Sequence, residues 1–226
     1  VDYLCLGNES DFIQSNPGAR KIENGNASLY LVKGQDYALP DAPEDERESL
    51  LEKDISRLDF TIHAMLLSSD GLVRSHPDSF EDLRQGVIRP VSSSALFDDP
   101  IRVLRAARLS AELPGFQLHD DTLGQMRAVA GLGLLGSIAP EQAGNEFLKA
   151  CLAPRPGNFL RRLHTTSALS PWFKELAHGG DTIAGLTAFH DDSILEHTAK
   201  TMDVTACLSR TYVMSENGHK QIRLAA

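Results

Sequence analysis

In the first part of the chain, the pattern of hydrophobic and polar positions predicts short strands and one short helix. Runs of apolar and aromatic residues bounded by turn residues predict strands at residues 1–7 (VDYLCLG), 19–23 (ARKIE) and 28–39 (SLYLVKGQDYAL). Residues 9–18 (ESDFIQSNPG) predict a short helix that ends at Pro17 and Gly18. The acidic run at 40–54 then becomes helical. The chain therefore begins as a mixed unit of strands and helices.

The middle of the chain changes from this mixed pattern to a helical one. Residues 65–75 predict a helix or strand, a turn at 69–71 and a returning strand, and residues 80–85 predict a short helix that ends at Gly86. Beyond residue 91 the pattern is helical throughout, with a further helix expected at 119–129 and another after the Pro/Gly residues at 154–157, with Phe159, Leu160 and Leu163 at its apolar positions. The fold class is therefore expected to be α+β.

The strongest helical pattern is DDPIRVLRAARLSAEL, residues 98–113. Two aspartates before a proline are typical of a helix start, so the helix is expected to begin near Pro100. Apolar residues at 101, 104 and 109 fall on a side that can face a core. Arg102, Arg105 and Arg108 recur every three residues and share about one third of the circumference.

Composition sets looser bounds on the function. The chain has 226 residues, 42% of them hydrophobic, which is enough for a substantial core in one or two domains. Its three cysteines are widely separated, which favours neither a disulfide framework nor a zinc site. A net charge of -9 argues against general coating of nucleic acid but not against a local basic groove. With no membrane-length apolar run and no signal-peptide pattern, a cytoplasmic location is expected.

The helix at 98–113 also has a chemical interpretation. A carboxylate accepts hydrogen bonds and a guanidinium offers a planar fork of donors, so Asp99 and Arg102 could together pair with the edge of a nucleobase. The alternative from chemistry alone is a capped helix with a solvated basic face, which is the commoner case.

Three segments lie in the order of three motifs of one known family. SRLDFTIHAM (56–65), FEDLRQGVIRPV (80–91) and DDPIRVLRAAR (98–108) resemble R-R-D-[FL]-T-[IV]-N-A-[ML], G-x-x-D-L-x-x-G-x-[IL]-R and E/D-D-x-x-R of the class II tRNA nucleotidyltransferases and bacterial poly(A) polymerases. The resemblance is densest from about residue 44 to residue 122. It implies a palm-like nucleotidyltransferase sheet, incomplete at its amino-terminal edge, followed by a helical neck and part of a helical body. The domains would be 1–92 (head), 93–155 (neck) and 156–226 (body, with the start of an HD-like domain).

The resemblance assigns roles to particular residues. Asp2 would match the second metal-binding aspartate of the first strand, and so would be catalytic and hold Mg²⁺. Arg57 would contact the triphosphate and Asp59 the ribose. The remaining nucleotide-binding candidates are on the arginine helix: Asp99, Arg102, Arg105 and Arg108. The sequence departs from the motifs where Leu58 replaces an arginine, His63 an asparagine and Gln142 an arginine.

Further residues have weaker interpretations. Arg155, Arg161 and Arg162 could contact an RNA backbone, or form a solvated basic helix end. His197 would be the first ligand of an HD-type metal site, but a structural role is favoured. For His63 a hydrogen-bonded core histidine is favoured over a catalyst. Glu141 and Glu146 either brace the nucleotide-site helix or face water.

The function that the resemblance implies is transfer of CMP and AMP from CTP and ATP to the 3′ end of tRNA, with magnesium required. The expected partners are tRNA and nucleoside triphosphates, without a membrane, and the oligomeric state is left open. The alternatives are an A-adding enzyme or poly(A) polymerase of the same family, and an RNA-binding relative without activity. The chain would lack the upstream phosphate loop, the first metal-binding aspartate and most of the HD domain, and alone could be inactive.

Overall fold

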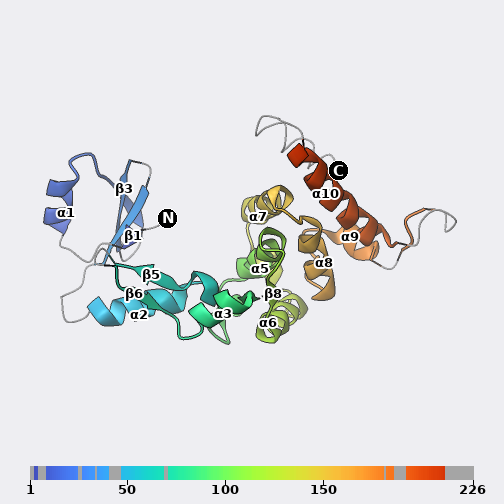
Figure 1. Ribbon diagram of the computed structural model, residues 1–226, viewed down its shortest axis with the longest axis horizontal. Coiled ribbons are helices and arrows are strands. Elements are labelled where there is room, and N and C mark those ends of the chain that lie inside the picture. Colours follow the sequence, from blue (N-terminus) through green and yellow to red (C-terminus); the bar gives the residue numbers. More distant parts are fainter. Residues whose placement is uncertain are drawn as a thin grey trace. The chain divides into compact units, whose positions relative to one another are not determined.

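The computed structural model describes residues 3–4, 9–24, 27–33, 35–40, 47–68, 71–180, 182–185 and 192–211. Its elements follow one another along the chain as β1 (Tyr3–Leu4), α1 (Glu9–Ser15), β2 (Arg20–Asn24), β3 (Ala27–Val32), β4 (Gln35–Pro40), α2 (Arg47–Arg57), η2 (Thr61–His63), β5 (Met65–Leu67), β6 (Val73–Ser75), α3 (Ser79–Gln85), β7 (Val87–Ile88), α4 (Ala95–Asp98), α5 (Ile101–Glu112), β8 (Gln117–Leu118), α6 (Asp120–Gly131), η3 (Leu134–Ser137), α7 (Pro140–Leu152), α8 (Gly157–Thr165), α9 (Lys174–His178) and α10 (Ile194–Thr211). The mixture of small sheets and many helices confirms the α+β class (Figure 1).

The chain divides into two compact units, Val1–Asp54 and Ile55–Ala226, and each is described by itself. The predicted boundaries at residues 92 and 155 both fall inside the second unit. The three-domain division from the family resemblance therefore stays a prediction.

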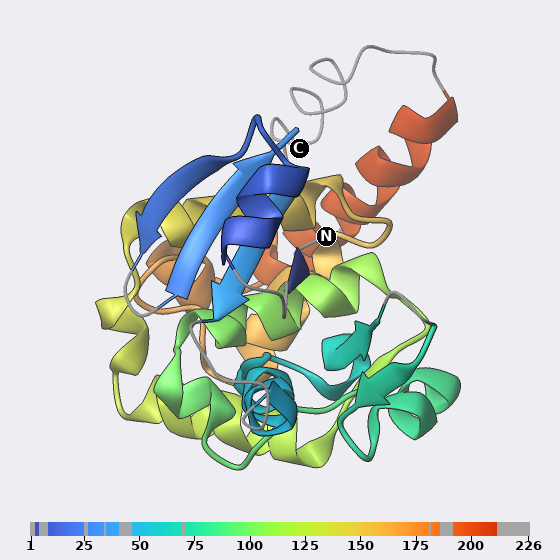
Figure 2. The same ribbon diagram turned by 90° about the vertical axis from the view of Figure 1, so that its left-hand side faces the viewer.

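The first unit is a four-stranded sheet in the order β1-β4-β3-β2, with one helix against it (Figure 2). β1 pairs with β4 in parallel, while β4, β3 and β2 are antiparallel neighbours. Phe12 of α1 packs on Tyr30 and Tyr37, with ring centroids 5.3 and 5.4 Å apart. The expected helix and the strand at 19–23 are thus confirmed, whereas residues 28–39 form two antiparallel strands, β3 and β4. Much of the first expected strand lies outside the described residues.

The second unit is built around α5, which packs against α4, α6, α7 and α8 (Figure 1). Ile101, Leu104 and Leu109 are buried, as their spacing predicts. The helix begins at Ile101, directly after Pro100, but no side-chain cap is formed: Asp98 belongs to α4 and accepts a hydrogen bond from Ser94 instead. The arginines of α5 therefore emerge from a helix whose other side is fixed in the core.

Two sequence-predicted details of the second unit are also confirmed. β5 and β6 form an antiparallel hairpin, and α3 ends at Gly86, whose φ of 69° is in the left-handed region that glycine adopts easily. A Cβ at Gly86 would lie 3.1 Å from the carbonyl oxygen of Gly115, so the glycine also allows β7 to approach β8. In the same unit, Trp172 donates a hydrogen bond to the Leu135 carbonyl and packs on the core.

Candidate nucleotide site

Asp59 is the residue at which the first and third motifs meet. It follows the end of α2, and its carboxylate lies against α5. Its Oδ1 is 2.7 Å from Nε of Arg102, and its Oδ2 accepts a hydrogen bond of 2.6 Å from Nη1 of Arg105. Both carboxylate oxygens of Asp59, the residue expected to bind the ribose, therefore contact the arginines that were expected to bind the base.

Arg102 is the most enclosed of the three arginines of α5. Its side chain is 13% exposed, and its Nη1 and Nη2 donate to the carbonyl oxygens of Ala95 (3.0 Å) and Arg57 (2.6 Å). Its buried Nε has the ion-pair contact with Asp59 but no hydrogen bond, because the N–H does not point at the carboxylate oxygen. All three nitrogens thus face protein groups, and Arg102 holds the first motif against α4 and α5.

Glu146 of α7 continues the ionic network along α5. Its carboxylate is 2.6 Å from Nε of Arg108 and 3.6 Å from Nε of Arg105, while Arg108 also pairs with Glu112 at 2.5 Å. With only 6% of its side chain exposed, Glu146 braces the arginine helix, whereas Glu141 is exposed. The sequence left open whether these glutamates brace the helix or face water: Glu146 braces the helix, and Glu141 faces water.

The neighbouring carboxylates raise the pKa of Arg105 and of Arg108. Burial lowers the pKa of Arg105, but the hydrogen bond to Asp59 and the charges of Asp59, Glu146 and Asp99 outweigh it, so the pKa lies above its usual value. Burial likewise opposes the charge of Arg108, and its bonds to Glu112 and Glu146 raise its pKa overall. Both guanidinium groups are therefore charged and paired with carboxylates on one helix face.

Two candidate residues keep their side chains available. Arg57 is exposed and Asp99 is half-buried, and neither side chain has a hydrogen bond or ion pair with another described residue. Asp99 is nevertheless near enough to Arg105 to raise the pKa of that guanidinium. An anionic ligand could therefore reach Arg57 without first breaking a contact of its side chain.

The second motif (80–91) contacts the first (56–65) through a buried carboxylate. Asp82 of α3, 1% exposed, accepts a pair of hydrogen bonds from Arg89 at 2.9 and 3.0 Å and a third of 2.7 Å from Thr61. Burial raises the pKa of Asp82, but these hydrogen bonds and the nearby charges outweigh it, so the pKa lies below its usual value. The bond from Thr61 also ties the turn after Asp59 to α3. Sequence reasoning gave Asp82 and Arg89 no role, although their motif spacing was the available signal.

His63 does not occupy the core, and the sequence-based interpretation as a core histidine was wrong. It is exposed at the end of η2, where the chain has turned outward after the buried Thr61 and Ile62. Partial enclosure and the charge of Arg108 lower its pKa, although the carboxylates of Asp59 and Glu112 oppose the shift.

This depressed pKa predicts a pH dependence of stability. The unfolded chain binds a proton at His63 more readily than the folded chain, so stability is highest above the unfolded pKa of about 6.5 and falls as the pH drops through the folded value. In urea titrations between pH 7.5 and 5, we expect a small decline in wild type that is reduced in His63→Gln. An equal decline in both proteins would contradict the assignment.

The other candidates are distributed outside this site. Asp2 lies outside the described residues. Arg155 is exposed and Arg162 half-buried, whereas Arg161 forms ion pairs with Glu196 and Asp203, each 2.8 Å long. The expectation that Arg161 is free to touch RNA is therefore wrong for this structure.

His197 is exposed on α10, and its structural role stays a prediction. Among the described residues no group of three His, Cys, Asp or Glu side chains is arranged to hold a metal ion. The suggestion that His197 is an HD-type ligand stays a prediction, because its neighbours His190 and Asp191 lie outside the described residues. In the same described ranges no helix is long and apolar enough to cross a bilayer.

Comparisons with known proteins show what the chain is similar to. No family model matches the chain. A multifunctional CCA protein of Pseudomonas putida is 36% identical over 204 residues, which cover 82% of this chain and 54% of the relative. A CCA-adding enzyme of Coxiella burnetii is 34% identical over 155 residues, covering 69% and 39%. The chain thus spans about half, or less, of the length of the curated relatives it matches.

Solved structures agree with these relatives in fold. The CCA-adding enzyme of Thermotoga maritima complexed with tRNA aligns with a TM-score of 0.66 at 20% identity, covering 97% of this chain and 55% of that chain. The enzyme of Bacillus stearothermophilus in complex with CTP aligns with a TM-score of 0.58 at 24% identity, covering 71% and 42%. The chain has the fold of a nucleotidyltransferase. In sequence it is similar to the proteins named multifunctional CCA protein and CCA-adding enzyme.

Proposed function

We propose that the protein of which this chain is a part transfers CMP and AMP from CTP and ATP to the 3′ end of tRNA. The observation that carries the proposal is the convergence on Asp59, where a carboxylate of the first motif is held between Arg102 and Arg105 of the third. The curated relatives, which are named multifunctional CCA proteins and CCA-adding enzymes, support the same choice of reaction.

In the proposed reaction, the 3′ hydroxyl of the RNA attacks the α-phosphorus of the nucleoside triphosphate. A phosphodiester bond forms, the bond to the pyrophosphate breaks, and the hydroxyl proton is lost. Arg57 would bind the triphosphate, because it is the exposed arginine of the first motif and its side chain has no partner among the described residues. Asp59 would accept hydrogen bonds from the ribose hydroxyls.

Base selection is assigned in this proposal to Asp99, Arg102 and Arg105, with Arg108 supporting the same helix. Arg102 can offer its donors to a base only after exchanging its contacts with Asp59 and the two carbonyl groups. A ribose that engages Asp59 would weaken one of these contacts. Sugar binding and base recognition would then be coupled through a single carboxylate.

The same proposal includes a magnesium ion, which Asp2 would help to bind. The ion would supply positive charge at the reacting phosphates and the leaving pyrophosphate. Since Asp2 lies outside the described residues and the described ones hold no group of three ligand side chains, the ligand set stays a prediction.

The test is incorporation of labelled CTP and ATP, separately and together, into tRNA trimmed of its 3′ end, with the natural-length polypeptide after its intact mass is checked. Two cytidines followed by one adenosine are the expected product. ATP use only after a terminal CC would instead indicate an A-adding enzyme, and ATP extension of trimmed tRNA a poly(A) polymerase. No incorporation by a folded, mass-verified protein would overturn the enzyme proposal and favour an RNA-binding relative.

A comparison of two arginines on one helix tests the assignment of roles. Arg102→Ala is expected to reduce the discrimination between CTP and ATP at least tenfold more than Arg108→Ala, because Arg102 would meet the base while Arg108 is held by Glu112 and Glu146. The measurement is kcat/KM for each nucleotide on tRNA that ends before the second cytidine to be added, with thermal melts of both variants. Equal losses of discrimination would count against the assignment.

A further inference from the structure

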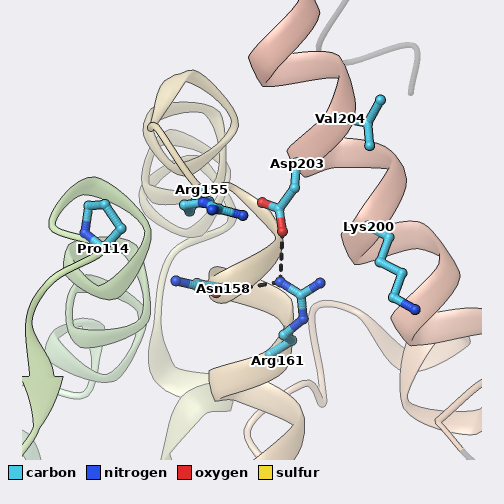
Figure 3. A pocket seen from close by; sticks show the side chains of 7 residues that line it. All are labelled: Pro114, Arg155, Asn158, Arg161, Lys200, Asp203 and Val204. Atoms are coloured by element: carbon cyan, nitrogen blue, oxygen red, sulfur yellow. Dashed lines mark hydrogen bonds and ion pairs between the residues drawn. The ribbon is translucent and has the colours of Figure 1, made fainter.

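A pocket between α8, α10 and the segment after α5 contains two of the three arginines that the sequence offered for RNA contact. Its volume is about 570 Å³, and five polar residues line it: Arg155, Asn158, Arg161, Lys200 and Asp203. Figure 3 shows Arg155, Asn158 and Arg161 on the α8 side, with Lys200 and Asp203 on α10. We call it the α8–α10 pocket.

The arginine at the base of the pocket has a structural task. Arg161 donates from Nε and Nη2 to Glu196 at 2.9 and 2.8 Å and from Nη1 to Asp203 at 2.8 Å. The hydrogen bonds to Glu196, followed by those to Asp203, raise its pKa despite burial. Arg161 therefore fixes α8 to α10 and is not available to a ligand.

The single carboxylate of the pocket is compensated on both oxygens. Oδ2 of Asp203 accepts from Arg161, and Oδ1 accepts a hydrogen bond of 2.9 Å from the backbone N–H of Gly157, at the start of α8. A carboxylate that receives an ion pair and a helix N-terminal N–H opposes an approaching anion less than a free one would.

Two cations remain at the accessible part of the pocket. Arg155 is exposed, its backbone is fixed by a bond to the Ala111 carbonyl, and its side chain has no partner among the described residues. Lys200 is 55% exposed and pairs with Asp192, which does not line the pocket. An ion pair between such exposed groups is weak and exchanges easily for another anion.

The balance of charge favours an anionic ligand. Arg161 is balanced by Glu196 and Asp203, and Lys200 shares its charge with the exchangeable partner Asp192. Arg155 is then the lining cation whose charge no carboxylate of the described residues offsets. Placed cations of this kind bind phosphate groups without reading a base. We propose that the α8–α10 pocket binds a phosphodiester of the RNA backbone through Arg155 and Lys200. The choice of RNA rests on the proposed function, and the assignment replaces Arg161 by Lys200 as a direct contact.

The test is binding of trimmed, fluorescently labelled tRNA to the full chain, followed by anisotropy between 50 and 200 mM KCl. Arg155→Gln and Lys200→Gln are each expected to weaken binding roughly three- to tenfold, and each to reduce the slope of log K against log salt by about one. Arg127→Gln removes an exposed arginine of α6 that does not line the pocket, and is expected to leave both quantities near wild type. Unchanged tRNA binding by both pocket variants would overturn the proposal.

Two further readouts separate the possible failures. Inorganic phosphate is titrated at constant ionic strength: if the pocket variants lose phosphate binding but not tRNA binding, the site takes free phosphate and the RNA proposal is wrong. CMP incorporation is measured in parallel. If wild type incorporates CMP and the pocket variants bind tRNA as wild type does, only the proposal for the α8–α10 pocket is refuted. Pocket-dependent tRNA binding without incorporation refutes only the transferase, and absence of tRNA binding by wild type refutes both.

Discussion

Replacing Arg89 by methionine is expected to lower the free energy of unfolding by about 3–5 kcal/mol at pH 7, the usual result of removing one partner from a buried ion pair. Asp82 would keep its bond to Thr61 but would lose both bonds from Arg89 in an environment where it is 1% exposed. Urea unfolding followed by circular dichroism measures the change.

The pH dependence of this difference identifies its cause. The folded pKa of Asp82 is depressed, so its stabilising contribution is fully present above the unfolded pKa of about 3.9 and is lost as the pH falls through the folded value. The gap between wild type and Arg89→Met should therefore narrow below about pH 4. A gap that stays constant into acid would show that lost packing, and not the carboxylate, causes the destabilisation.

Arg84, on the same helix as Asp82, provides a matched control. It pairs with Glu81 through side chains that are both largely exposed, so Arg84→Met is expected to change the unfolding curve little. A similar loss in the two variants would contradict the importance assigned to burial at Asp82.

Changing Asp59 to asparagine is expected to reduce kcat/KM for CMP incorporation at least a hundredfold, equivalent to about 2.7 kcal/mol of transition-state stabilisation. The substitution leaves the shape of the side chain but removes the charge that holds Arg102 and Arg105, and it removes an acceptor proposed for the ribose. Steady-state kinetics on trimmed tRNA provide the measurement.

The control for Asp59 is Asp98→Asn, which removes the same charge from an exposed position on α4 where the carboxylate bonds only Ser94 among the described residues. It is expected to retain most of the activity. Thermal melts separate loss of catalysis from loss of fold. Near wild-type kinetics for Asp59→Asn would contradict both the holding of the arginines and the ribose contact.

Periodicity predicted most of the second unit because burial there follows local spacing. The apolar residues of α5 and of α8 face the core as expected, and Gly86 ends α3 as its conformational freedom allows. The side-chain cap expected before α5 did not form, because residue 98 already belongs to the short helix α4. A cap depends on backbone direction over two or three residues, which composition does not determine.

The candidate site was predicted as a set of residues but not as a set of contacts. Sequence spacing could bring Arg102, Arg105 and Arg108 to one face, since that follows from helix geometry. It could not show that Asp59 and Glu146, from segments 43 and 38 residues away from Arg102 and Arg108, neutralise that face. Of these contacts, only the i,i+4 pair of Arg108 with Glu112 could be predicted from spacing along the helix, and the sequence analysis did not include it.

The hydrogen bond from Gly157 to Asp203 connects the beginning of one helix to a residue 46 positions later. A Cβ at Gly157 would lie 2.3 Å from the carbonyl oxygen of Ala199, so α10 can seat on the start of α8 only because that position has no side chain. During synthesis, α8 leaves the ribosome before its cap exists, and its first turn gains this partner only when α10 arrives. The contacts of α8 with α5 can form before those with α10, so the first turn of α8 is completed last.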